Sequence, residues 1–112
     1  MATNTASIAA SPIAQGVKRI VREFDPEAEV ILYGSRARGD AEPDSDWDFL
    51  VLVKHTLSFD EERALSRRIY DLELQSDQVF SSIIRTKSEW QGPLSKAMPF
   101  HKNVEREGIA VP

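Results

Sequence analysis

Two short apolar runs lie close together in the chain and limit the folds that are open to it. Residues 30–33 and 49–53 are rich in β-branched, leucine and aromatic side chains. Runs of this length and composition predict buried β-strands. Gly34 directly follows the first run, and Asp46 and Asp48 open the second. The sequence therefore predicts a tight turn and a pair of carboxylates a short loop apart, each beside a strand.

The spacing of the two carboxylates suits a divalent metal ion. Residues i and i+2 of a strand face the same way, with Cα atoms about 6.6 Å apart. Two carboxylates that close repel each other and lose hydration unless a cation lies between them. Oxygen ligands on a strand suit Mg²⁺, which prefers carboxylates supplemented by water and phosphate. The alternative is a solvated loop-to-strand boundary, although Trp47 between the acids favours a strand with one core-facing side.

The remaining segments predict an alternation of helices and strands. Apolar residues at helical spacing, capping boxes at Ser58 and Thr86, and the break before Pro26 define the elements. We predict helices at residues 12–24 and 60–74, between Thr86 and Gly92, and at 99–107, and strands at 29–33, 49–53 and 78–85. This order, α-β-β-α-β-α, indicates one α/β (α+β) domain over residues 12–112, preceded by a disordered N-terminus at residues 1–11.

Composition excludes several classes of protein. The chain has 14 basic and 18 acidic residues in 112, which argues against a dedicated nucleic-acid binder with a broad basic face. It has no cysteine, so disulfides and thiolate metal sites are excluded. It shows no leader sequence and no apolar run of membrane-spanning length, so we expect a cytoplasmic protein.

Residues 33–48 resemble the active-site signature of the DNA polymerase β-like nucleotidyltransferases, and in particular of the minimal nucleotidyltransferases (MNT). That signature is an apolar residue, Gly, Gly or Ser, a spacer of about ten residues and Asp-x-Asp or Asp-x-Glu. Residues 34–40, Gly-Ser-Arg-Ala-Arg-Gly-Asp, are closest to the minimal branch. The resemblance covers residues 12–84. It implies a nucleotidyltransferase fold, a short mixed β-sheet backed by helices with the active site on the open face.

The resemblance gives each residue of the block a role. Asp46 and Asp48 would be the catalytic ligands of Mg²⁺, one of them bridging two ions. Gly34 would let the backbone approach a phosphate, and Ser35 would donate to it from the start of a short helix. Without the aspartates, a plain strand-to-helix turn with a serine cap would be the better reading of Gly34 and Ser35.

Two arginines of the block are candidates for neutralising triphosphate charge. Arg36 and Arg38 carry guanidinium groups, which pair well with phosphate oxygens. The alternative is that one of them pairs with an acid of the loop. The candidates for that pairing are Asp40, Glu42 and Asp44. We expect the two histidines, His55 and His101, to be surface or half-buried residues without a catalytic role.

One position departs from the family pattern. Catalytic members usually carry a third carboxylate on the later strand, but residues 78–84 contain no acid. Ser81, or else Ser82, occupies the expected place. Because that acid usually shares the metal that activates the acceptor hydroxyl, its loss threatens chemistry more than nucleotide binding. The nearby acids Asp71, Glu73 and Asp77 could substitute only if the chain bends toward the site.

Two functions follow from the resemblance. The first is Mg²⁺-dependent transfer of a nucleoside monophosphate from an NTP, with ATP as the expected donor, to a hydroxyl group. Minimal members often pair with a small helical HEPN-domain protein, and some are antitoxins that attach AMP to it. The acceptor would then be a partner protein or a second copy of the chain. The alternative is a degenerate module that binds a nucleotide or a partner without turnover. A structural domain with a chance motif is a third reading.

Overall fold

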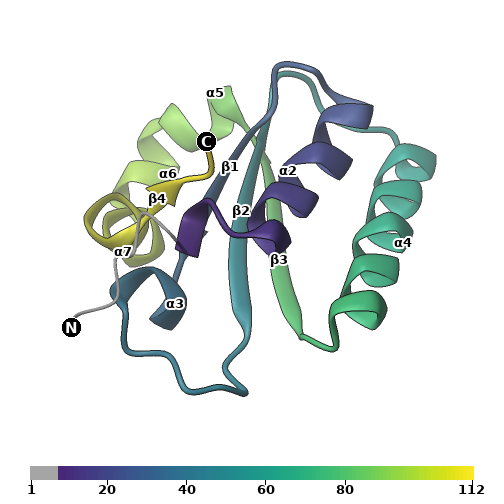
Figure 1. The fold of residues 1–112 in the computed structure, drawn as a ribbon. Helices are drawn as coiled ribbons and strands as arrows, with labels where there is room; N and C mark the ends of the chain where they lie inside the picture. Colours follow the sequence, from purple (N-terminus) through teal and green to yellow (C-terminus); the bar gives the residue numbers. More distant parts are fainter. Residues whose placement is uncertain (1–7) are drawn as a thin grey trace.

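The computed structural model describes residues 8–112, which form a four-stranded sheet with helices on both faces (Figure 1). The strand order is β3-β2-β1-β4. The strands are β1 (Glu29–Tyr33), β2 (Trp47–Val53), β3 (Phe80–Thr86) and β4 (Ile109–Ala110). The helices are α2 (Pro12–Phe24), α3 (Ser35–Arg38), α4 (Phe59–Ser76), α5 (Lys87–Gln91), α6 (Pro93–Ala97) and α7 (Pro99–Glu107).

Strand β2 is the centre of the fold, and its sequence explains why. From Phe49 to Val53 it is apolar at every position, and all five residues are buried. An unbroken apolar strand is stable only where both faces of the sheet are covered. Phe49 contributes to the cluster under α2 and α4, while Leu50 contributes to the cluster under α5 and α7. The two clusters therefore hold the same strand from opposite sides.

Strand pairing puts three chemically distinct side chains in one row. Strands β1 and β2 are antiparallel with Tyr33 opposite Asp48, and β2 and β3 are parallel with Asp48 opposite Ser81. Side chains alternate along a strand, so these three lie on the face that also carries Leu50. The row lies at the end of the sheet where α3 and the loop between β1 and β2 are found (Figure 1).

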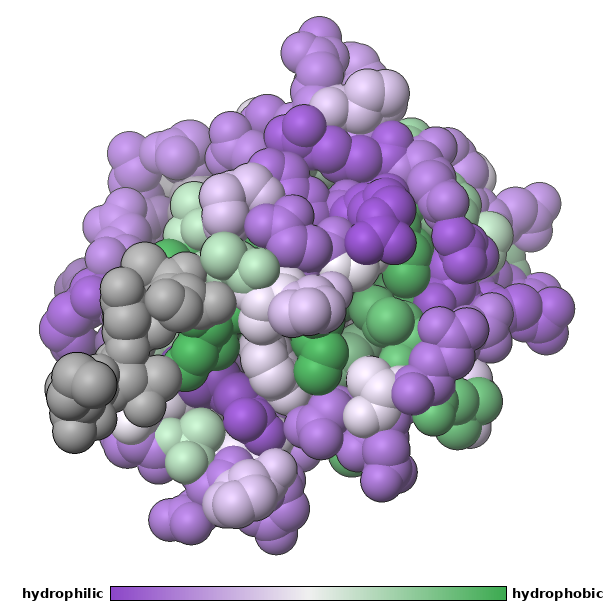
Figure 2. Space-filling model, viewed as in Figure 1, coloured by the Kyte–Doolittle hydropathy of each residue, from purple (hydrophilic) through white to green (hydrophobic). Residues whose placement is uncertain are grey.

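The sheet face that carries this row is covered along much of its length. Helices α5, α6 and α7 lie on it, and Trp90 and Val104 pack against Leu50 and Leu52 (Figure 1). The expectation of an open face is therefore met only around Asp48. The covering helices follow β3, beyond the segment on which the resemblance rests. Helices α2 and α4 cover the other face, and most of the surface on the side seen in Figure 2 is hydrophilic.

The predicted elements agree well with the observed ones. The mixed sheet, the helix–strand order and both capping boxes, at Ser58 and Thr86, are confirmed. Strand β3 begins at Phe80 rather than at residue 78. Strand β4 was not predicted, because its two residues carry no local pattern and it exists through its pairing with Ile31 and Leu32 of β1.

The N-terminal boundary differs from the prediction. The expected disorder covers residues 1–11, of which residues 1–7 lie outside the described part of the chain. In the rest of that segment Ala9 is buried, Ile8 packs on the core, and Ser11 caps α2. The small residues of this segment predicted polar coil, whereas Ala9 is almost completely buried. No helix within residues 8–112 is both long and apolar enough to cross a membrane.

Candidate active site

The Asp48 carboxylate packs directly on the backbone of Gly34. Gly34 joins β1 to α3 with φ of 76°, a left-handed conformation that side chains rarely adopt. A Cβ atom at this position would overlap Oδ2 of Asp48. The glycine is therefore required twice, once for the turn and once to leave room for the carboxylate.

Asp46 lies next to Asp48 and influences its ionisation. Asp46 precedes the first residue of β2 and is exposed, whereas Asp48 is half-buried within the strand. Burial raises the pKa of Asp48 above its ordinary value, and the negative charge of Asp46 raises this pKa further, while Arg38 lowers it. Burial also raises the pKa of Tyr33, and the charge of Asp48 adds to that rise. The site therefore concentrates negative charge.

Ser35 is the first residue of α3 and lies beside this carboxylate pair. Gly34 precedes it as the N-cap, and Gly39 ends the four-residue helix with φ of 85°. The first amides of a helix have no acceptor within it, so the N–H groups of Ser35 and Arg36 are left for an outside acceptor. Within residues 8–112 the Ser35 hydroxyl makes no hydrogen bond, which leaves it free to donate as well.

Arg36 points away from the carboxylates and holds the loop between β1 and β2. Its Nη2 donates to the carbonyls of Pro43 and Ser45, at 3.2 and 2.8 Å, and to Oε1 of Gln78 at 3.3 Å. The guanidinium also lies 4.7 Å above the Trp47 ring. These contacts make Arg36 a positioning residue in this structure, because they fix the loop immediately before Asp46.

Gln78 completes this network and was not singled out from the sequence. Its Oε1 also accepts a hydrogen bond from Nε1 of Trp47 at 3.1 Å, so one amide joins the start of β2, the start of β3 and α3. A glutamine before an apolar strand gives no local signal of such a role. Trp47 itself is 6% exposed and faces the core, as its position between two acids predicted.

Arg38 lies at the rim of the site. It is exposed and forms ion pairs with Asp40 at 3.2 Å and with Glu107 of α7 at 3.1 Å. Pairing with the loop acid Asp40 was the alternative foreseen for it, but the pairing with α7 was not. The pair with Asp40 is exposed and therefore weak, whereas Glu107 is half-buried, so Arg38 can exchange at least Asp40 for a phosphate at little cost.

Ser81 is the nearest residue to Asp48 on the outer strand. It pairs in register with Asp48, faces the same side of the sheet and is exposed, whereas Ser82 faces the opposite side. Within residues 8–112 no group of three or more His, Cys, Asp or Glu side chains is arranged to hold a metal. Asp71, Glu73 and Asp77 therefore do not supply the third carboxylate.

The residues present nevertheless fit a divalent cation bound by two carboxylates. Asp46 and Asp48 are close enough to couple electrostatically. Neither forms an ion pair with any arginine, lysine or histidine in the described part of the chain. Mg²⁺ accepts one or two protein carboxylates, with water and phosphate completing its shell. The donor set therefore suits Mg²⁺ that arrives with a phosphate ligand.

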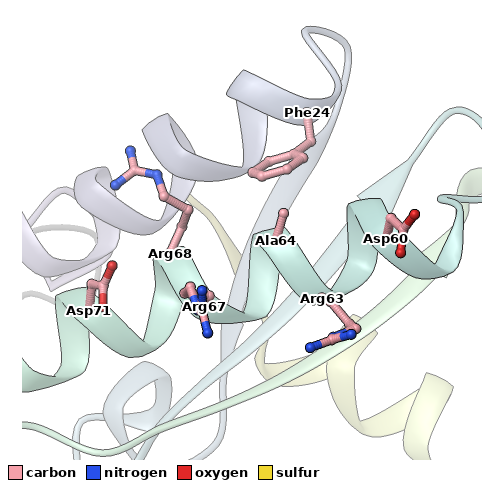
Figure 3. A pocket seen from close by; sticks show the side chains of 7 residues that line it. All are labelled: Phe24, Asp60, Arg63, Ala64, Arg67, Arg68 and Asp71. Carbon is pink, nitrogen blue, oxygen red and sulfur yellow. The ribbon is translucent and has the colours of Figure 1, made fainter.

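A separate hollow of about 420 Å³ lies on the other side of the sheet, between α2 and α4 (Figure 3). Phe24 and Ala64 line it together with charged side chains of α4. Arg68 reaches toward α2 and is held there by Glu23 at 2.7 Å. This hollow lies on the face opposite to Asp48, so it takes no part in the candidate active site.

Substitution of Gly34 tests the contact between the turn and the carboxylate. Gly34→Ala must strain a left-handed backbone and displace the Asp48 side chain, so we expect the free energy of unfolding to fall by about 2 kcal/mol or more. Gly39→Ala is the comparison, since it strains a left-handed helical backbone, with φ of 85° and ψ of 12°, at a glycine away from Asp48 and should cost about 1 kcal/mol. Urea unfolding measures both, and equal losses would argue against the carboxylate contact.

Substitution of Asp48 should stabilise the protein at neutral pH. The pKa of Asp48 is raised in the folded state, so the folded state binds more protons and stability falls as pH rises through that pKa. Asp48→Asn removes this penalty near pH 7 but gains nothing below the ordinary pKa of 3.8. Urea unfolding at both pH values checks this, with the exposed loop variant Asp44→Asn as control. An unchanged or lower midpoint for Asp48→Asn at pH 7 would contradict the prediction.

Comparisons with known proteins agree on the family. Residues 14–107 match the model of the nucleotidyltransferase domain. A putative protein adenylyltransferase of Methanocaldococcus jannaschii is 39% identical over 78 residues, which cover 62% of this chain and 79% of that protein.

Two solved structures share the fold. One is a crystal structure of a toxin–antitoxin pair with AMP-PNP, with a TM-score of 0.59 at 18% identity, covering 88% of this chain and 71% of that one. The other is a mutant of the toxin–antitoxin pair MntA–HpeT, with a TM-score of 0.59 at 16% identity and the same coverage. The family match over most of the chain shows that this protein belongs to the nucleotidyltransferase domain family and is a transferase.

Proposed function

We propose that this protein transfers a nucleoside monophosphate from a nucleoside triphosphate, with ATP as the expected donor, to a hydroxyl group of a partner protein in a Mg²⁺-dependent reaction. The observation that carries the proposal is the pair Asp46 and Asp48, which forms no ion pair within residues 8–112, and of which Asp48 contacts Gly34, the residue before the free donors of Ser35. Carboxylates attract the metal, and the donors attract the phosphates that the metal brings.

Each residue of the site would bind a different part of the Mg²⁺–triphosphate complex. The Ser35 hydroxyl and the first amides of α3 donate to the terminal phosphates, and Gly34 keeps the approach clear of side chains. Arg38 exchanges its exposed partner Asp40 for the triphosphate and neutralises part of its charge. Asp46 and Asp48 would hold Mg²⁺, which would neutralise the phosphates and lower the pKa of the attacking hydroxyl. Alignment and charge neutralisation are the main sources of rate.

The reaction needs no reactant other than the nucleoside triphosphate and the acceptor hydroxyl. The acceptor oxygen forms a bond to the α-phosphorus, the bond between the α-phosphorus and the bridging oxygen breaks, and pyrophosphate leaves. The hydroxyl proton passes to solvent, since no described acid lies where the third carboxylate of the family is expected. The acceptor approaches from the side of Ser81, which is exposed next to Asp48.

A protein acceptor is supported by the relatives. The archaeal relative is described as a protein adenylyltransferase, and both structural neighbours are toxin–antitoxin pairs. We therefore propose a small helical protein of the HEPN type as the acceptor, and a second copy of this chain as the other candidate. The chain's net charge of −4 does not favour nucleic acid in that role.

A binding module without turnover is the second candidate function. The observation that favours it is Ser81, which puts a hydroxyl where a third metal ligand would lie. The intact pair of Asp46 and Asp48 opposes a module that binds only a partner protein, because burying part of a charged carboxylate is costly and brings no gain to a domain that binds no cation. A nucleotide-binding module would keep the pair, so label transfer is what separates that module from an enzyme.

Calorimetric titration with ATP tests the nucleotide site directly. Wild-type protein should bind ATP only with Mg²⁺ present, and Asp46→Asn/Asp48→Asn should lose that binding because it lacks the charges that hold the metal. Glu42→Gln/Asp44→Asn, which removes two exposed loop acids that form no ion pair with any described residue, is the control and should bind as wild type does. Transfer of label from α-labelled ATP to a candidate partner then separates enzyme from binding module. Binding that persists without Asp46 and Asp48 would refute the proposed site.

Restoring the third carboxylate should strengthen the site. Ser81→Asp places an acid directly beside Asp48 on the same face, so we expect Mg²⁺ affinity to rise roughly tenfold and label transfer to rise with it. Ser82→Asp is the matched control, since its side chain faces the opposite side and should change neither. Isothermal titration with Mg²⁺ gives the affinities. Equal effects of the two variants would show that the row of Tyr33, Asp48 and Ser81 does not define the metal site.

A further inference from the structure

An apolar groove of about 840 Å³ opens on the same face of the sheet as Asp48. Strand β3 and helices α5, α6 and α7 enclose it. Its walls include Ile83, Trp90, Leu94, Met98, Phe100 and His101. The roles assigned to the active site use none of these residues.

The groove begins where the candidate active site ends. Ile83 pairs in register with Leu50, two residues beyond the pair of Asp48 and Ser81, which is about 6.6 Å along the strands. The rings of Phe100 and Tyr33 meet edge to face with centroids 5.3 Å apart, and Tyr33 lies opposite Asp48. If the phosphates of a nucleotide lie at the candidate metal site, its sugar is long enough to span this distance and bring the base to the groove.

The walls of the groove suit a flat aromatic ring. Trp90 packs against Phe100 edge to face at 5.8 Å and stacks on His101 at 4.2 Å. On the outer wall, Leu94 is 86% exposed and Met98 is 57% exposed, so large apolar surfaces face water. Nucleobases stack on aromatic and apolar side chains and would cover these surfaces.

His101 adds a polar group that has no partner. It is 2% exposed, which corrects the expectation of a surface or half-buried position. Its Nε2 makes no hydrogen bond with any described residue, and the nearest acid, Oε1 of Glu105, is 3.7 Å away. A buried nitrogen without a partner is costly, and a ligand with a polar edge could relieve that cost where an aliphatic side chain could not.

We propose that this groove holds the base of the nucleoside triphosphate, with the ring against Leu94, Met98 and Trp90 and its polar edge toward His101. The inference rests on the proposed function, which locates the triphosphate. It identifies in addition the surface that recognises the nucleoside. An apolar segment of the protein acceptor is the competing occupant, and the experiment separates the two.

The experiment compares two ligands that differ by the nucleoside. Calorimetry measures the affinity of Mg²⁺·ATP and of Mg²⁺·tripolyphosphate, which carries the phosphates without a base. The variant Leu94→Asp/Met98→Asp puts charge on the outer wall at exposed positions, where folding is not at risk. Leu74→Asp, at a residue of α4 that is 64% exposed, is the matched control. Circular dichroism checks that wild-type protein and every variant, including His101→Phe, are folded.

We expect wild-type protein to prefer ATP over tripolyphosphate by roughly 5- to 150-fold, the range of one stacked base. The groove variant should lose most of this preference while its affinity for tripolyphosphate stays unchanged, and Leu74→Asp should retain it. His101→Phe keeps a ring beside Trp90 but removes the nitrogen, so it should reduce the preference without weakening tripolyphosphate binding.

Three results would overturn the inference, and one of them also removes the proposed function. Equal affinities for the two ligands in wild-type protein would show that the base is not recognised. An unchanged preference for ATP in the groove variant would place the base elsewhere. If label transfer were lost in that variant while its preference for ATP stayed unchanged, the groove would belong to the acceptor. Binding of neither ligand to wild-type protein would refute the nucleotide site together with its base pocket.

Discussion

The contact between the Asp48 carboxylate and the Gly34 backbone determines how β1, β2 and the turn after β1 are arranged at the candidate active site. Strands β1 and β2 are paired so that the turn after one strand faces a charged side chain of the other. The fold can bring a carboxylate this close only because residue 34 has no side chain. The charge is half-buried at the end of a strand whose remaining length is fully apolar, so the two hydrophobic clusters provide the free energy that keeps it in place.

Much of this arrangement could be predicted from the sequence, because its determinants are local. The unbroken apolar run of β2, the capping boxes at Ser58 and Thr86, and the alternation around Trp47 each act over a few residues, and they predicted the elements correctly. The family signature then supplied the roles proposed for Gly34, Ser35, Asp46 and Asp48. The structure places these four residues beside one another.

What could not be predicted depends on contacts between distant segments. The ion pair of Arg38 with Glu107 joins residues 69 positions apart, and Gln78 bonds to Arg36 across 42 positions. Strand β4 exists through its pairing with β1. The burial of His101 follows from the packing of α7 on Trp90 of α5. No periodicity or motif encodes these pairings, since they are decided by which side chains the finished fold brings together.

The two arginines of the signature illustrate how one motif can serve two purposes. Arg36 has three hydrogen-bond acceptors and the face of Trp47, so its guanidinium stabilises the loop that delivers Asp46. Arg38, two residues later, is itself exposed, and its partners are the exposed Asp40 and the half-buried Glu107, so its guanidinium remains within reach of a ligand. The sequence left both residues with the same two candidate roles, phosphate binding and pairing with a loop acid, and the structure separates them by where each side chain finds partners.

The position of β3 has a consequence for the size of what this protein can act on. As the last strand in the sheet order, β3 has no further strand beyond it within residues 8–112, and its Ser81 is exposed directly beside Asp48. At this edge the described residues form no wall around the space next to Asp48. For the transfer proposed above, selection there would rest on the shape and charge of a docked surface rather than on fit within a cavity, so a whole folded macromolecule would present its hydroxyl as easily as a small alcohol would.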